Sequence, residues 1–228
     1  MLRIPFAARA AAGLAGCLLF ALSGCKKALE PEPVEALTIV SGNLQLRQVG
    51  RALRAPLVFR ATNAGGKGVG GTAITIVVVQ GGGAVDSASI KTDANGEARV
   101  KWTLGAEVGQ GLLATIPGVE PLRVNATGIL PNDIVIAQGN NQSAKVSVAL
   151  VNQVVVRVLG GSNTPMDSIN VTFQITGGGG AIAPQSILTN ASGEATVKWT
   201  MGPVSGTNTA LVRAATIDPI TITATATP

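Results

Sequence analysis

The sequence predicts an all-β protein of two tandem antiparallel β-sandwich domains, which follow a signal peptide and a short linker rich in Pro and Glu. Three observations predict this fold. The second half of the chain repeats the first, short runs of β-branched residues lie between glycine clusters in both halves, and no segment after residue 26 has a helical period with caps.

Residues 1–24 have the pattern of a lipoprotein signal peptide. Arg3 and Arg9 supply positive charge, and the apolar stretch from Ala10 to Leu22 is shorter than the roughly 20 residues that a membrane-spanning helix needs. The stretch ends in Leu-Ser-Gly-Cys, which resembles the bacterial lipobox, so we expect Cys25 to carry lipid. The alternative is an ordinary secretory signal that ends near a chance Cys.

The predicted anchor and the residues after it place the protein in the bacterial cell envelope. Residues 25–36 form the lipidated Cys and a linker, because the Glu-Pro alternation after Lys26 favours an extended tether. Lys26 is not the Asp that favours inner-membrane retention in well-studied enteric bacteria, so we expect a lipoprotein of the outer membrane. The sequence leaves open whether the protein faces the periplasm or the cell surface.

The rest of the chain divides into two copies of one unit, residues 37–128 and residues 129–228. An offset of 97 residues aligns them with one inserted residue near the end. The densest match joins Gly96–Gly105 to Gly193–Gly202. A unit of about 95 residues is a whole domain, since solenoid repeats have periods of about 20–50 residues.

Each copy has the pattern of an antiparallel β-sandwich. In the first copy we expect strands at 56–62, 72–79 and 97–104, and in the second copy at 154–159, 169–176 and 194–201. The stretch 97–104 alternates strictly, with Trp102 on the apolar face and Lys101 on the polar face. Short strands with turn signals every 8–12 residues favour an immunoglobulin-like sandwich.

These residues resemble the bacterial immunoglobulin-like domains of group 1, the repeats in invasin and intimin stalks. The resemblance is carried by the Gly-Gly-Gly-Ala turns at 81–84 and 178–181, the Thr-x-x-x-Gly-x-Ala entries at 92–98 and 189–195, and the Trp-Thr-Leu-Gly run at 102–105. It covers nearly all of residues 37–228 and implies a stalk or surface module. The chain is too short for the membrane barrel and lectin-like tip of invasin-type proteins.

The recurring Trp and Gly residues are the motif positions of each copy. Trp102 and Trp199 share a face with Val100 and Val197, so we expect both to pack in the core; the alternative is stacking on a sugar. Gly96 and Gly193 recur in turns. The neighbouring acidic residues are also interpreted as turn formers, not as calcium ligands, because the second copy replaces them while it keeps the turn: Asp86, Asp93 and Asn95 become Ala183, Asn190 and Ser192.

Two further patterns are interpreted as structural. Residues 66–71 fit G-x-G-x-x-G, but they precede a strand and not the helix that a dinucleotide site needs. Glu97 and Glu194 recur singly on the outward face of a strand, whereas a glycosidase needs two carboxylates in one cleft. We therefore expect no catalytic residue, no metal and no cofactor.

Composition narrows the function further. The sequence has no His, and the predicted mature domains have no thiol, so no nucleophile stands beside a base. Few aromatic residues argue against a nucleic-acid partner. We expect a non-enzymatic envelope lipoprotein that acts as an adhesion, spacer or assembly module, anchored through Cys25, with a protein or glycan partner; the alternative is a lipoprotein that binds a glycan or another ligand. The ligand and the oligomeric state stay open.

Charge differs between the copies. Residues 37–128 carry nine basic and five acidic residues, and residues 129–228 carry four of each. The basic excess favours an acidic surface such as anionic lipid, or it is simply a solvated face.

Overall fold

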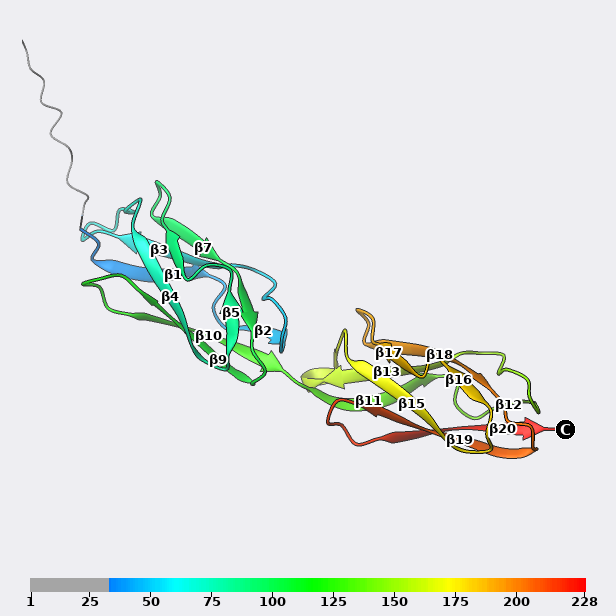
Figure 1. The fold of residues 1–228 in the computed structure, drawn as a ribbon. Helices are drawn as coiled ribbons and strands as arrows, with labels where there is room; N and C mark the ends of the chain where they lie inside the picture. Colours follow the sequence, from blue (N-terminus) through cyan, green and yellow to red (C-terminus); the bar gives the residue numbers. More distant parts are fainter. Residues whose placement is uncertain (1–32) are drawn as a thin grey trace, which may run out of the picture. The chain divides into compact units, whose positions relative to one another are not determined.

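The computed structural model describes residues 33–228, which form two β-sandwiches, each made of sheets packed face to face (Figure 1). This confirms the predicted all-β class with immunoglobulin-like sandwiches. The predicted signal peptide and Cys25 lie outside the described residues. The described helical structure is limited to the 3-10 turn Gly161–Asn163.

The first sandwich contains ten strands. One side has the sheet β1-β3-β7 and the pair β5-β8, and the other side has the sheet β2-β10-β9-β4-β6. The bounds are β1 Ala36–Ser41, β2 Gln45–Gln48, β3 Leu57–Thr62, β4 Ala73–Gln80, β5 Gly83–Val85, β6 Ser89–Lys91, β7 Glu97–Val100, β8 Trp102–Leu104, β9 Gly109–Thr115 and β10 Leu122–Ile129.

The second sandwich repeats this order with small changes. Its sheets are β11-β13-β18-β16, with β14 paired to β13, and β12-β20-β19-β15-β17. The bounds are β11 Pro131–Gln138, β12 Gln142–Lys145, β13 Val154–Gly160, β14 Thr164–Pro165, β15 Asn170–Gly177, β16 Ala181–Ala183, β17 Ser186–Leu188, β18 Glu194–Thr200, β19 Gly206–Ala214 and β20 Ile220–Thr227.

The expected continuous strand at 97–104 is wrong in the first copy. It divides into β7, which pairs with β3, and β8, which pairs with β5. The division falls at Lys101, whose backbone N–H donates to the Asp86 carboxylate at 3.0 Å. A side-chain acceptor here replaces a ladder partner. In the second copy Ala183 stands at this position and pairs with Lys198, so β18 runs unbroken.

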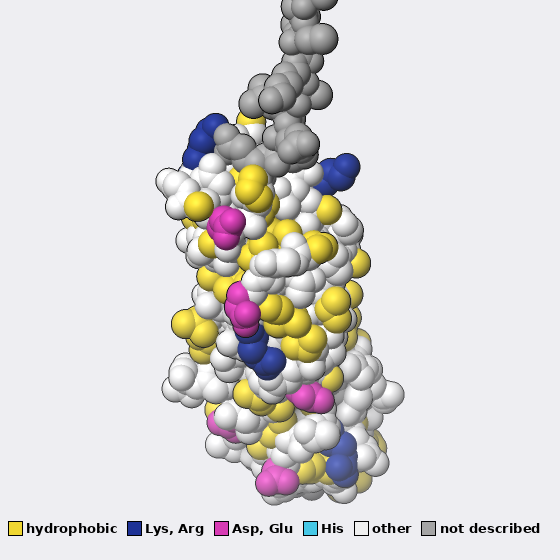
Figure 2. Space-filling view, turned by 90° about the vertical axis from the view of Figure 1, so that its left-hand side faces the viewer, with side chains coloured by type: hydrophobic (Ala, Val, Ile, Leu, Met, Phe, Trp, Pro, Cys, Tyr) yellow, Lys and Arg dark blue, Asp and Glu magenta, His cyan; other side chains and the backbone are white. Residues whose placement is uncertain are grey.

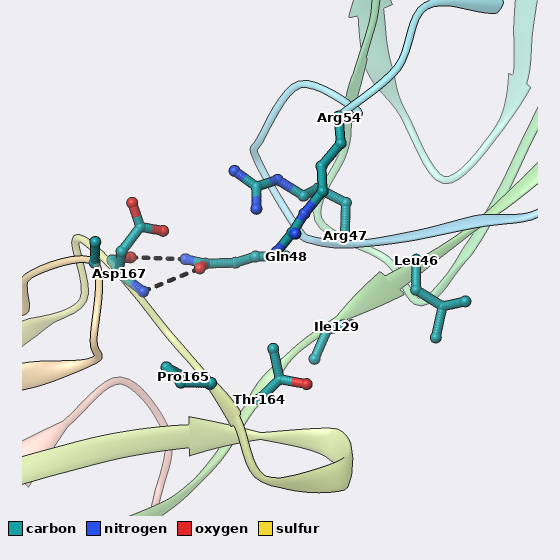
Figure 3. A pocket seen from close by; sticks show the side chains of 9 residues that line it. Leu46, Arg47, Gln48, Arg54, Ile129, Thr164, Pro165 and Asp167 are labelled. Carbon is teal, nitrogen blue, oxygen red and sulfur yellow. Dashed lines mark hydrogen bonds between the residues drawn. The ribbon is translucent and has the colours of Figure 1, made fainter. Parts of the chain in front are cut away.

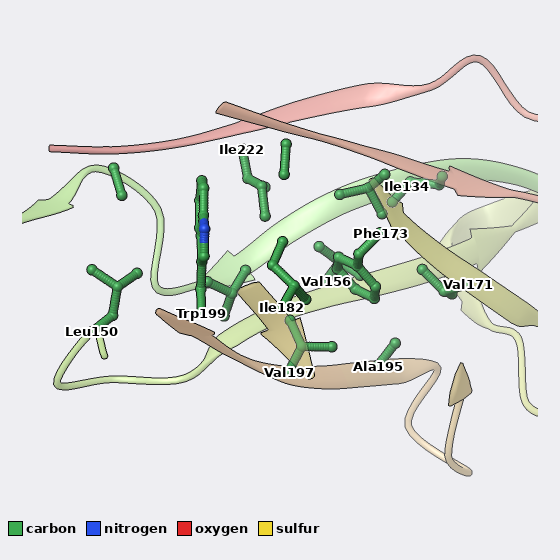
Figure 4. Packing of buried hydrophobic residues seen from close by; sticks show 14 of the residues in the cluster. Ile134, Leu150, Val156, Val171, Phe173, Ile182, Ala195, Val197, Trp199 and Ile222 are labelled. Atoms are coloured by element: carbon green, nitrogen blue, oxygen red, sulfur yellow. The ribbon is translucent and has the colours of Figure 1, made fainter. Parts of the chain in front are cut away.

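The two cores are built from the inward residues of the facing sheets. Phe59, Trp102 and Leu112 are buried in the first core, and Phe173, Trp199 and Ile222 are buried in the second. Figure 4 shows Trp199 rising from β18 toward Ile222, near Leu150. Burial of these large apolar side chains is the main favourable contribution to each sandwich.

The triple-glycine turns at 81–83 and 178–180 pack closely against β8 and β18, respectively. A Cβ atom on Gly83 would lie 2.3 Å from the backbone oxygen of Thr103, and one on Gly180 would lie 2.2 Å from that of Thr200. The three glycines of each turn also have positive φ angles, which other residues rarely adopt. These turns therefore require glycine for both space and conformation.

Candidate binding groove at the junction of the sandwiches

The recurring Trp residues lie in the cores, and the recurring Gly residues lie in turns. Trp102 and Trp199 are each 1% exposed. Gly96 and Gly193 have φ angles of +77° and +75°. A Cβ atom on Gly96 would lie 2.7 Å from Cα of Gly68, so the 66–71 loop packs against this turn.

The side chains of Asp93 and Asn190 accept hydrogen bonds from backbone N–H groups of their own turns. The Asp93 carboxylate accepts hydrogen bonds from the N–H groups of Asn95 and Glu97 at 2.8 and 2.9 Å, and Asn190 makes the equivalent pair of bonds in the second copy. Within residues 33–228 no three His, Cys, Asp or Glu side chains gather as metal ligands would. In the same part of the chain no helix has the length and apolar character to span a bilayer.

The recurring glutamates are paired with arginine. Glu194 on β18 accepts a hydrogen bond from Arg157 on the neighbouring strand β13, and Glu97 lies 3.5 Å from Arg99. The Arg157 hydrogen bond is the main reason why the pKa of Glu194 lies below 4.5, and burial opposes this shift. These carboxylates serve ion pairs on the sheet surface.

The two sandwiches meet through a short connection and a set of polar contacts. Only Leu130 lies between the end of β10 and the start of β11. Gln48 is 8% exposed; its side chain donates to the backbone oxygen of Asp167 at 2.8 Å and accepts from the backbone N–H of Asp167 at 3.1 Å (Figure 3). Arg51 donates to the Asp167 carboxylate at 2.7 Å. These contacts join the β2 end of the first copy to the loop before β15.

Two adjoining cavities, of about 330 and 350 Å³, form a groove at this junction. They share Leu46, Ile129 and Thr164. The first is lined in addition by Arg47, Gln48, Arg54, Pro165, Asp167 and Ala191, and the second by Val108, Thr127, Gly128, Leu130, Asn132, Gly161 and Ser162. The groove therefore has a charged half and a more apolar half.

The charged half is basic. The Asp167 carboxylate is already paired with Arg51, and both side chains are about one-third exposed. Arg47 donates from Nε to the backbone oxygen of Ala52, and Arg54 has no hydrogen bond or ion pair among the described residues. In Figure 3 the guanidinium groups of Arg47 and Arg54 lie on the side of the groove where Gln48 meets Asp167. Two cationic groups thus face the groove without a carboxylate.

The basic excess of the first copy was predictable from its sequence, but this groove was not. The available signal was a cluster of three arginines, Arg47, Arg51 and Arg54, at positions where the aligned second copy has Ala144, Val148 and Val151. Figure 2 shows one face on which basic and acidic side chains are scattered among hydrophobic and neutral ones. This face presents no broad basic surface for anionic lipid.

No protein-family model and no curated protein sequence matches the chain. Three solved structures are similar to it over 84% of its length: the D0-D1 domain of intimin (17% identity, TM-score 0.34), the adhesin InvE of Yersinia pseudotuberculosis (16%, 0.43) and invasin, a bacterial integrin-binding protein (19%, 0.44). The chain spans 95%, 59% and 40% of these structures, respectively. The neighbours are bacterial adhesin domains, and the likeness is one of fold.

Proposed function

We propose that this protein is a non-enzymatic lipoprotein of the bacterial cell envelope, whose tandem immunoglobulin-like sandwiches form a rod that serves as an adhesion, spacer or assembly module on the cell surface. The observation that carries the proposal is repetition. Two sandwiches of nearly the same topology follow each other with one residue between β10 and β11. The lipobox-like Leu-Ser-Gly-Cys and the Glu-Pro linker supply the anchor and the tether.

The distribution of polar groups supports a non-catalytic role. Glu97 and Glu194 form ion pairs on strands, and Asp93 caps a turn. The groove brings arginines together with a single carboxylate, which is already paired. This arrangement suits binding, since acid–base catalysis uses titratable groups whose pKa values lie near the working pH.

Protease shaving of intact cells tests the proposal, with an antibody against residues 37–228 as the readout. Loss of signal from intact cells supports a surface role, and protection until the outer membrane is permeabilised contradicts it. Replacement of Cys25 by Ala should release the protein from the membrane fraction. Cys17→Ala is the matched control, because this Cys lies in the apolar stretch and its loss should leave anchoring unchanged.

The second candidate function is a ligand-binding lipoprotein, and the junction groove favours it. A sugar-binding surface would be expected to expose an aromatic ring for stacking. Within residues 33–228 all four aromatic side chains are buried: Phe59, Trp102, Phe173 and Trp199. The ligand-binding alternative therefore depends on the groove and its arginines.

A further inference from the structure

The ligand class of the junction groove follows from its two halves. Arg47 and Arg54 present guanidinium groups, which match the planar geometry of a carboxylate and bind it through paired hydrogen bonds. The adjoining half offers Leu46, Val108 and Leu130, which are 64%, 50% and 43% exposed. A ligand that fills both halves carries an anionic group next to an apolar group.

The lining of the apolar half favours a polypeptide over an acyl chain. Four polar residues, Thr127, Asn132, Ser162 and Thr164, line this half together with its apolar residues. An acyl chain would cover these polar groups without hydrogen-bonding to them, which costs free energy. The amide groups of an extended peptide can form hydrogen bonds with them while its side chains contact Val108 and Leu130.

Glycans and single-stranded nucleic acids fit the lining of the groove less well than a polypeptide does. Glycans and single-stranded nucleic acids are usually held by stacking on aromatic rings. The residues that line the two cavities include no aromatic side chain. Charge alone would then have to bind such a polymer, and the basic half offers only two arginines without a carboxylate partner, Arg47 and Arg54.

The internal repeat gives a comparison for this cluster. Gln45 and Gln142 make the same two backbone contacts in the two copies, so the segments 42–55 and 139–152 have the same local fold. The fold therefore does not require arginine at positions 47, 51 and 54, where the second copy has Ala144, Val148 and Val151. Within the described residues, the basic cluster lies in the first copy, at the β2 end that contacts the second sandwich.

We propose that the junction groove binds an acidic segment of a partner polypeptide. Its carboxylates pair with Arg47 and Arg54, and an apolar side chain beside them enters the half lined by Val108 and Leu130. Arg51 remains on Asp167 and holds the junction together. This inference goes beyond the adhesion, spacer or assembly role and does not depend on the lipid anchor, so surface shaving and the binding experiment can fail independently.

Fluorescence anisotropy tests the proposal, with the full chain in non-ionic detergent and a labelled short peptide that alternates glutamate and leucine. The double variant R47A/R54V introduces the residues of the second copy, and we expect it to bind about tenfold more weakly. The variant K91A/K101A removes the same charge from exposed positions elsewhere on the first sandwich and should bind like the wild type. Equal losses in the two variants would overturn the proposal, because binding would then be non-specific charge attraction.

Two further arms define the ligand class. Val108→Thr keeps the side-chain shape but replaces one methyl group by a hydroxyl. It should weaken binding of the glutamate–leucine peptide about threefold and leave binding of a glutamate–glycine peptide unchanged. Inorganic phosphate and heparin are the competing probes. Tighter binding of heparin than of the peptide at equal ionic strength, or loss of peptide binding to phosphate at low millimolar concentration, would overturn the assignment to a polypeptide. Circular dichroism and the thermal midpoint verify that each variant is folded.

Discussion

The segments 42–55 and 139–152 occupy the same place in the two sandwiches but present different surfaces. Gln45 and Gln142 each bond to a glycine oxygen three residues back and to the backbone ten residues ahead. Around this shared frame the first copy carries Arg51 and the second carries Val148, which is 50% exposed. The frame is set by backbone contacts, so the outward side chains are free to differ with function.

The outer faces of the five-stranded sheets differ in the same way. In the first sandwich Val77 lies opposite Leu113, and Val79 is 46% exposed. In the second sandwich Gln174 lies opposite Leu211, and Thr176 bonds to Thr209 through their hydroxyl groups. The inner faces keep valine, isoleucine and alanine in both copies. Both cores are therefore built from apolar side chains with one Phe and one Trp each, whereas the outer faces differ in polarity.

The largest expected effect is the loss of stability when the buried Trp of either core is removed. It tests whether Trp102 and Trp199 contribute equally to their sandwiches. Trp102→Ala and Trp199→Ala should each lower the free energy of unfolding of their own sandwich by about 3–5 kcal/mol, because each removes a fully buried aromatic side chain. Urea denaturation of the full chain measures both. The Phe variants, which retain most of the volume, should lose less. A loss below about 1 kcal/mol in either Ala variant would contradict the assignment of that Trp to the core.

The next largest effect is a difference in stability loss between two buried side-chain amides, Gln110 and Asn208, which lie at equivalent turns of the two copies. Gln110 accepts from Gly105 N–H and donates to the backbone oxygens of Gly81 and Glu107, whereas Asn208 accepts from Gly202 and donates to Gly206. Replacement by Ala leaves buried backbone groups unpaired, at about 1–3 kcal/mol. Gln110→Ala should be the more destabilising variant in urea, since it loses one more hydrogen bond. The reverse order would contradict this reason.

A smaller effect is expected at the junction. Asp167→Asn keeps the backbone bonds to Gln48 but removes the charge that pairs with Arg51. Because both side chains are about one-third exposed, we expect a loss of less than about 1 kcal/mol in thermal unfolding. The same variant frees Arg51 and should strengthen the acidic peptide in the anisotropy assay. Unchanged or weaker peptide binding would contradict an electrostatic effect of the Asp167 charge on the groove that it lines.

The smallest effect concerns acid stability of the second copy. The pKa of Glu194 is lowered from 4.5 in the folded protein, chiefly by Arg157. The ionised form therefore contributes stability above pH 4.5, and this contribution disappears as the pH falls through the lower, folded-state pKa. Glu194→Gln should remove this part of the pH dependence. Parallel stability curves for wild type and variant between pH 6 and pH 3 would contradict it.

The fold was predictable because its determinants are local and occur twice. The alternation at 194–200 and the glycine clusters identify strands and turns without any knowledge of contacts. The break at Lys101 was not predictable, since it depends on a contact with Asp86, which lies just after β5 and 15 residues before Lys101. The groove depends on a still longer separation: Arg51 and Asp167 are 116 residues apart, and no pattern in either copy states which loops meet.

The parallel pairing of the second and last strands of each sandwich has a mechanical consequence. β2 pairs with β10 in parallel from Gln45 to Gln48, and β12 pairs with β20 from Gln142 to Lys145. A force that pulls on the two ends of a sandwich slides such paired strands along each other. It therefore loads their hydrogen bonds together instead of opening them one at a time. A tethered chain of such units can resist the drag of flowing liquid until a whole ladder breaks at once.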